Sequence, residues 1–191
     1  ILTHAERNFP DVEMVSVTVD NPRHRQNYKT FAKRCRQLAN VLSSLGAKFG
    51  DRIGTLAWND YRHMELYYGI SGSGMVCHTI NPKLFPEQVS YIINHAEAKI
   101  LFADVLVMPL LEALKAHLGK IEAIVVMTES AHMPESTLPN VLCYEELLAE
   151  QSDDFDWPEF DENTASGMCY TSGTTGNPKG VVYSHRSTLL H

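Results

Sequence analysis

Residues 52–80 read RIGTLAWNDYRHMELYYGISGSGMVCHTI, and they carry the clearest structural pattern in the chain. Short apolar runs at 52–58 and 75–80 predict two buried strands, and residues 61–71 between them predict a helix. Two strands joined by such a helix normally run parallel in one sheet, because the crossover returns the chain to the same edge. The stretch therefore predicts an α/β fold built on a parallel sheet.

The same alternation continues toward residue 150. Further strands are predicted at 99–103, 121–128 and 141–144, and further helices at 86–95, 105–118 and 145–150. Pro86 stands at a first helical position, where its missing N–H removes no helical hydrogen bond. Repeated strand–helix alternation predicts a largely parallel sheet with helices on both faces, so residues 47–150 are expected to form a βα core.

Residues 15–46 are expected to form a hairpin followed by a helix. Val15, Val17 and Val19 alternate with polar residues, which is the period of a strand. From Tyr28 to Leu45 apolar residues recur at spacings of three and four, which predicts a helix with one buried stripe. Around the start of this helix lies a group of basic residues that we interpret as a solvated helix face: Arg23, Arg25, Lys29, Lys33, Arg34 and Arg36.

Composition excludes several classes of protein. Hydrophobic residues make up 44% and charged residues 20%, as in ordinary globular domains, while the formal charge of -7 argues against a nucleic-acid partner. No apolar run is long enough to predict a transmembrane helix. The cysteines lie among apolar neighbours without zinc-ligand spacing, so we expect reduced core residues in a cytosolic protein; they are Cys35, Cys77, Cys143 and Cys169.

Residues 151–163 interrupt the pattern with six acidic residues and predict an exposed connector. Two apolar strands follow, at 165–170 and 181–183, and Ser184 is a plausible N-cap for a helix that starts at His185. The loop between the strands, residues 171–180, reads TSGTTGNPKG. We therefore treat residues 165–191 as a loop-bearing hairpin and the beginning of a helix.

The composition of this loop is suited to binding phosphate. Its glycines let the backbone approach a ligand closely, and successive backbone N–H groups can surround an anion. Ser and Thr hydroxyls add donors, and Lys179 adds a positive charge. The loop lacks the Walker spacing, because Pro178 stands where that motif requires glycine before lysine. The glycines at 69–74 are likewise in the wrong order for a dinucleotide fingerprint, and they predict a helix end instead.

The sequence YTSGTTGNPKGV at 170–181 resembles the AMP-binding signature of the adenylate-forming superfamily. This superfamily contains acyl-CoA synthetases, adenylation domains of peptide synthetases and beetle luciferases. Other stretches resemble the same proteins, and some resemble the branch of bacterial medium- and long-chain fatty acyl-CoA synthetases and the ligase for 3-methylmercaptopropionate: QNYKTF at 26–31, GDRIG at 50–54, LAWNDYRH at 56–63, CHTINP at 77–82 and VYSHR at 182–186.

The resemblance implies that residues 1–191 are an incomplete N-terminal AMP-binding domain. The chain starts at Ile1 rather than Met and ends in mid-pattern at His191, so both ends are expected to be cuts. The resemblance also implies a ligase that uses ATP, Mg²⁺ and CoA to convert a carboxylic acid first to acyl-AMP and then to a thioester. The expected phosphate-binding residues are Thr171, Ser172, Gly173, Thr174, Thr175, Gly176 and Lys179. Thr171 also matches a position that helps to hold Mg²⁺ in relatives.

The adenine-binding segment, the ribose-binding aspartate, the magnesium glutamate and the catalytic lysine of the family lie beyond the matching region. No catalytic residue is therefore expected in this stretch, and we expect it to be inactive alone. Relatives often dimerise through this domain, so the resemblance implies a homodimer. No role is assigned to Trp58, Asn59, His63 or His78, and Trp58 is expected to pack in the core.

Two other functions remain open from the residues. An amino-acid adenylation domain of a peptide synthetase would use the same loop but would load a carrier protein instead of CoA. A truncated homologue without catalysis would only bind phosphate.

Overall fold

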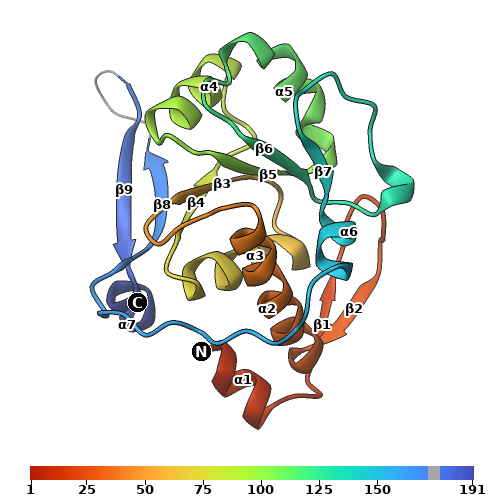
Figure 1. Cartoon of the computed structure of the whole chain (residues 1–191), viewed down its shortest axis with the longest axis vertical. Coiled ribbons are helices and arrows are strands. Elements are labelled where there is room, and N and C mark those ends of the chain that lie inside the picture. Colours follow the sequence, from red (N-terminus) through yellow and green to blue (C-terminus); the bar gives the residue numbers. More distant parts are fainter. Residues whose placement is uncertain (172–176) are drawn as a thin grey trace.

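A seven-stranded sheet forms the centre of the computed structural model, which describes residues 1–171 and 177–191 (Figure 1). The strands lie side by side in the order β7-β6-β5-β3-β4-β8-β9. All neighbours pair in parallel except β8 and β9, which pair antiparallel. The strands are β3 (Arg52–Leu56), β4 (Val76–Ile80), β5 (Ile100–Ala103), β6 (Ala123–Val126), β7 (Val141–Cys143), β8 (Ala165–Thr171) and β9 (Lys179–Ser184).

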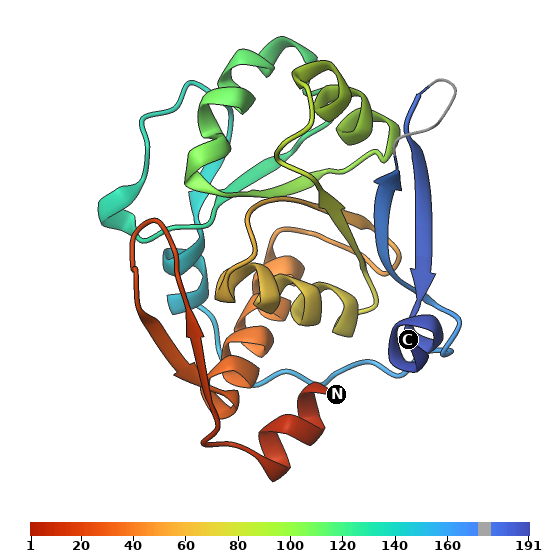
Figure 2. The same cartoon turned by 180° about the vertical axis from the view of Figure 1, so that it is seen from behind.

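Helices cover both faces of the sheet (Figures 1 and 2). One face packs against α2 (Tyr28–Ser44), α3 (Tyr61–Gly72) and α6 (Tyr144–Ala149), and the other against α4 (Pro86–His95) and α5 (Met108–Ala113). Successive side chains of β5 point to opposite faces of the sheet and enter the apolar cluster on each face. Phe102 enters the first cluster, while its neighbours Leu101 and Ala103 enter the second. The predicted α/β class and the largely parallel sheet are therefore confirmed.

The N-terminal part contains α1 (Leu2–Asn8) and a separate antiparallel hairpin of β1 (Glu13–Ser16) and β2 (His24–Asn27). Helix α2 begins where the Asn27 side chain accepts a hydrogen bond from the Thr30 N–H at 2.9 Å. Its C-terminal end is followed by Gly46, whose φ of 79° is easily adopted only by glycine. Local end signals thus set the limits of this helix.

The hairpin strand differs from the expected 15–19 segment, because Val17 and Val19 lie outside β1. Residues 17–23 leave the strand ladder and form a turn. In this turn Thr18 donates to Asp20 at 2.6 Å and accepts from the Asn21 N–H at 2.9 Å. These side-chain hydrogen bonds replace the ladder bonds that a longer strand would have made.

The helix expected at 105–118 is also divided. A 3₁₀ turn (Val105–Val107) precedes α5, and a second 3₁₀ turn (Lys115–His117) follows it. Pro109 lies in the first turn of α5 and has no N–H to continue a hydrogen-bond ladder from Val105. The missing N–H of Pro109 therefore explains why the helix starts at Met108.

Two expectations about burial were wrong. Trp58 lies beyond the end of β3 and is 41% exposed, because the chain turns there toward α3. Cys169 is only partly buried, since it faces an open groove beside β8, whereas Cys35, Cys77 and Cys143 are buried; none of the four forms a disulfide among the described residues. No helix in the described part of the chain is long and apolar enough to cross a membrane.

The segment 151–163 runs across the surface without helix or strand. Helix α2 holds it through backbone carbonyls: Arg36 donates to Asp153 O at 2.8 Å, and Asn40 donates to Ser152 O and Asp154 O. Trp157 anchors its middle against α3, because a Cβ on Gly72 would lie 2.7 Å from the indole ring. The segment is thus exposed but attached to the helical layer.

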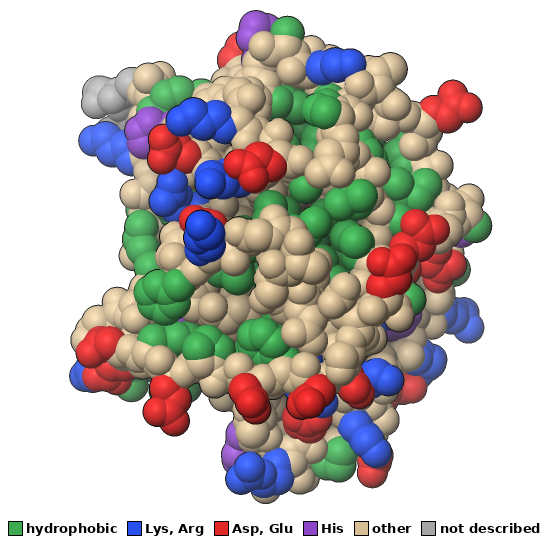
Figure 3. Space-filling view, viewed as in Figure 1, with side chains coloured by type: hydrophobic (Ala, Val, Ile, Leu, Met, Phe, Trp, Pro, Cys, Tyr) green, Lys and Arg blue, Asp and Glu red, His purple; other side chains and the backbone are tan. Residues whose placement is uncertain are grey.

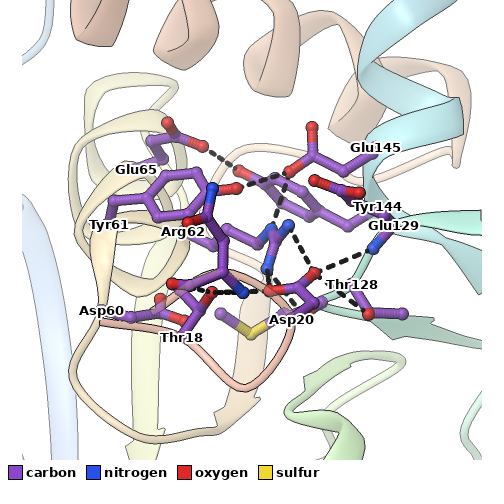
Figure 4. Close-up of polar contacts among 12 residues, drawn as sticks. Thr18, Asp20, Asp60, Tyr61, Arg62, Glu65, Thr128, Glu129, Tyr144 and Glu145 are labelled. Atoms are coloured by element: carbon purple, nitrogen blue, oxygen red, sulfur yellow. Dashed lines mark hydrogen bonds and ion pairs between the residues drawn. The ribbon is translucent and has the colours of Figure 1, made fainter. Parts of the chain in front are cut away.

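A buried ion network connects the hairpin loop, α3 and α6 (Figure 4). Arg62 on α3 has a side chain only 1% exposed. Its guanidinium donates to both carboxylate oxygens of Asp20, at 3.0 and 2.9 Å, and its Nε donates to Glu145 at 2.7 Å. Asp20 also accepts from the backbone N–H of Glu129 at 3.2 Å. One arginine therefore joins three segments that are distant in sequence.

Arg34 extends this network into α2. It donates to Glu65 at 2.7 Å and to Glu145 at 2.9 and 3.0 Å, and Tyr144 donates its hydroxyl to Glu65 at 2.8 Å. Burial raises the pKa of Glu65 despite the nearby Arg34, whereas Arg34 and Arg62 together outweigh burial and lower the pKa of Glu145. The interpretation of Arg34 as part of a solvated face was wrong, because its acidic partners come from other elements.

We predict that Arg62→Met lowers the free energy of unfolding by about 3–5 kcal/mol, because Asp20, whose side chain is 2% exposed, would keep a buried charge without its ion-pair partner. Urea unfolding followed by circular dichroism measures the change. The control is Arg25→Met, which removes an ion pair with Glu13 whose side chains are 56% and 52% exposed. It should cost less than about 1 kcal/mol. Equal losses in the two variants would contradict a stabilising role of the network.

Candidate functional site

The β8–β9 hairpin carries the loop that the sequence marks as phosphate-binding. Thr171 is the last residue of β8 and Lys179 the first of β9, and the two lie directly opposite each other in the antiparallel ladder. Both are exposed. The other predicted phosphate-binding residues lie outside the described part of the chain: Ser172, Gly173, Thr174, Thr175 and Gly176. The structure thus brings together the two ends of the predicted site.

Neighbouring elements fix the hairpin at the edge of the sheet. β8 pairs in parallel with β4, where His78 lies opposite Met168, so the carboxyl ends of both strands point the same way. Ligands of open α/β sheets commonly bind at such carboxyl ends. After β9, the Ser184 side chain accepts from the Ser187 N–H at 3.1 Å and starts α7 (His185–Leu190), as the sequence predicted.

The charge at this tip suits an anion. Among the described residues, Lys179 forms no ion pair, and its exposed side chain carries a positive charge at this tip. Thr171 offers a hydroxyl across from it. The chemistry of this pair is that of a cation and a neutral donor, which can bind phosphate but cannot by themselves transfer a proton.

A metal ion would need further ligands. Within residues 1–171 and 177–191, no three His, Cys, Asp or Glu side chains gather in a way that could hold a metal. The Thr171 hydroxyl can supply one oxygen to Mg²⁺, an ion that keeps several waters and takes other ligands from substrate phosphates. The described residues fit a magnesium ion that arrives with a nucleotide, and they do not form a separate cage for it.

A groove of about 840 Å³ lies beside the hairpin, between α3, β8, α7 and the 151–163 segment. Its wall includes Tyr67, Cys77, Cys169 and Trp157, with Gly167 leaving space on β8. Figure 3 shows hydrophobic side chains gathered near α7 and this segment. The groove can take an apolar group. Gly167 within the apolar strand β8 is a local signal that could have indicated the groove.

The four residues without an assigned role lie in different environments. Trp58 contacts Lys83, whose Nζ is 5.7 Å from the indole ring, and Asn59 is exposed. His63 is buried, with Nε2 3.0 Å from the Thr55 hydroxyl and Nδ1 3.2 Å from Trp58 O. These contacts explain His63 as a structural residue that joins the first turn of α3 to β3 and to Trp58.

His78 is fully buried on β4, and neither ring nitrogen has a hydrogen-bond partner among the described residues. Burial, followed by the positive charge of Arg52, lowers the pKa of His78 to about 4. The imidazole is therefore neutral in the folded protein near pH 7.

Comparisons with known proteins agree with one another. The family model described as AMP-binding enzyme matches residues 2–190. The chain is 49% identical to the 3-methylmercaptopropionyl-CoA ligase of Ruegeria lacuscaerulensis and 46% identical to the medium-chain-fatty-acid–CoA ligase of Ectopseudomonas oleovorans. Each match covers 100% of this chain but 35% of the relative, so the chain spans about a third of the length of these proteins.

Solved structures give the same result. The anthranilate CoA ligase AuaEII, in complex with anthranoyl-AMP, superposes with a TM-score of 0.82 at 25% identity. The superposition covers 97% of this chain and 34% of that one. The N-terminal domain of FACL13 from Mycobacterium tuberculosis, with an inhibitor bound, gives a TM-score of 0.74 at 26% identity.

We predict that His78 makes the fold sensitive to acid. Its pKa is lowered in the folded state, so its stabilisation is complete above the unfolded value of 6.5 and is lost as the pH falls toward about 4. Between pH 7 and pH 5, His78→Leu should lose about 2 kcal/mol less unfolding free energy than the wild type. Urea unfolding at both pH values measures this. The exposed His117→Leu should match the wild type, and an unchanged pH slope in His78→Leu would contradict the assignment.

Proposed function

Because the chain belongs to the AMP-binding enzyme family, we propose that its parent protein is an ATP-dependent acid–thiol ligase. The proposed substrate is an aliphatic carboxylic acid of the fatty-acid class, and the proposed acceptor is CoA. The single observation that carries this proposal is the β8–β9 hairpin, which sets Thr171 opposite Lys179 at the ends of the signature loop. Since the chain spans about a third of its relatives, the activity is proposed for the whole parent protein.

The proposed reaction has two steps. A carboxylate oxygen attacks the α-phosphorus of ATP, forming the acyl–AMP bond as the bond to pyrophosphate breaks. The CoA sulfur then attacks the acyl carbon, forming the thioester and releasing AMP. The first step brings two anions together, so neutralising charge is its main electrostatic requirement.

The described residues would serve the pyrophosphate side of the first step. Lys179 would hold the β- and γ-phosphates and then the departing pyrophosphate by a charge-assisted hydrogen bond. Thr171 would contribute its hydroxyl to Mg²⁺ or to a phosphate oxygen. We assign the same phosphate-binding role to residues 172–176 from their sequence alone. No catalytic acid or base is assigned to this stretch, and alone it should not turn over substrate.

The names of the relatives favour CoA over a carrier protein as acceptor. Proteins that are 46% and 49% identical over this whole chain are named as CoA ligases for a medium-chain fatty acid and for 3-methylmercaptopropionate. Both acids carry a carboxylate at the end of an acyclic chain, which is the class we propose here.

We further propose that the parent protein is a cytosolic homodimer. The free, buried thiols of Cys35, Cys77 and Cys143 are consistent with a reducing compartment. Relatives that dimerise through this domain motivate the oligomeric state. Analytical ultracentrifugation of the parent protein should give twice the monomer mass, and a monomer at micromolar concentration would contradict this part of the proposal.

We predict that Lys179→Met in the full-length parent lowers kcat/KM for ATP by about tenfold to a hundredfold, because one charged hydrogen bond to phosphate is lost. The assay supplies Mg²⁺, CoA and fatty acids of increasing length and follows pyrophosphate and AMP release. Lys120→Met is the control, because its side chain is 78% exposed at the other end of the sheet. A Lys179 variant as active as this control would contradict the phosphate role.

A further inference from the structure

The ring of Tyr170 lies at the base of the hairpin tip, one residue before Thr171. Its hydroxyl is 2.6 Å from Nδ1 of His95, and the two rings meet edge to face with centroids 5.8 Å apart. His95 is the last residue of α4, so this hydrogen bond joins the helical layer to the end of β8. Figures 1 and 2 both show α4 near the carboxyl end of β8.

Three further contacts hold the Tyr170 ring and its partner His95. His78 approaches it at 5.4 Å between centroids, and Tyr91 stacks on His95 at 5.2 Å with an angle of 27°. On the neighbouring strand Gly180 pairs with Tyr170, and a Cβ there would lie 3.3 Å from the phenol ring. The absence of a side chain at Gly180 thus lets the ring lie across β9.

These contacts bear directly on the proposed phosphate site. Tyr170 precedes Thr171, and Gly180 follows Lys179, so both strands are held one residue from the functional pair. β9 lies at the edge of the sheet and pairs with no strand other than β8 among those described. The side-chain contacts of Tyr170 with α4 therefore restrain a hairpin end that the sheet holds from one side.

The hydrogen bond between Tyr170 and His95 lies near the surface, so its loss should affect the stability of the fold little. His95 is exposed, and Tyr170 is half-buried. Losing a hydrogen bond at an exposed side chain opens no cavity, so it should change unfolding little. It should change the orientation of the strand end, because Tyr170 would lose its anchor to α4.

We propose that His95 is a positioning residue for ATP. It holds the Tyr170 hydroxyl, and through it the paired Thr171 and Lys179, in the orientation that receives the nucleotide phosphates. His95 itself does not touch the substrate. This inference rests on the proposed function of the same hairpin and adds a residue outside the signature motif.

The test uses the full-length parent protein with ATP, Mg²⁺ and a fatty acid that supports turnover. We expect His95→Phe to raise KM for ATP by about two- to tenfold, the effect of one lost hydrogen bond, while KM for the fatty acid and the melting temperature stay unchanged. The phenyl ring keeps the stacking on Tyr91. His95→Gln should recover part of the loss, because its amide can still bond the tyrosine hydroxyl. The exposed His132→Phe serves as the control and should behave as the wild type.

A double-mutant cycle tests whether His95 acts on ATP binding through Tyr170. Tyr170→Phe should raise KM for ATP like His95→Phe, and the double variant should be no worse than either single variant. Additive effects, or a His95→Phe enzyme with normal KM for ATP, would overturn the inference. A wild-type parent that binds no ATP would overturn the proposed function as well, whereas an active wild type matched by His95→Phe would overturn the inference alone.

Discussion

The buried guanidinium of Arg62 holds together parts of the chain that no strand pairing connects. It joins the loop of the N-terminal hairpin, through Asp20, to helix α6, through Glu145. Arg34 then links the same glutamate to Glu65 inside the helical layer. A buried charge is costly unless its partners are in place, so arrangements that separate these groups are disfavoured.

This arrangement has consequences for the sheet. With α2, α3 and α6 fixed on one face and α4 and α5 on the other, the strands are covered on both sides as a parallel sheet requires. β8 adds beside β4, and its partner β9 becomes the edge. The signature loop consequently lies at a carboxyl end of the sheet, where Tyr170 and α4 contact its base. The proposed ATP site depends on the core in this way, although no residue of the ion network reaches it.

Local signals predicted much of the fold. The apolar runs predicted the strands of the core, Pro86 predicted the start of α4, and Ser184 predicted the start of α7. Non-local contacts explain the failures. Arg34 looked like a surface residue because its partners Glu65 and Glu145 lie 31 and 111 residues away.

The same reasoning applies to the site. The motif identified Thr171 and Lys179, and the structure places them opposite each other, while their roles stay predictions. His95 could not be found from the motif, because it lies 75 residues from Tyr170 and meets it only after α4 folds onto the sheet.

The most direct test of the account is ATP–pyrophosphate exchange by the full-length parent protein in the absence of CoA. Labelled pyrophosphate enters ATP only if the enzyme forms acyl-AMP reversibly. The account predicts exchange that requires Mg²⁺ and a fatty acid and proceeds without CoA. Absence of exchange with every carboxylic acid, in a protein that is folded and binds ATP, would contradict an adenylate-forming ligase.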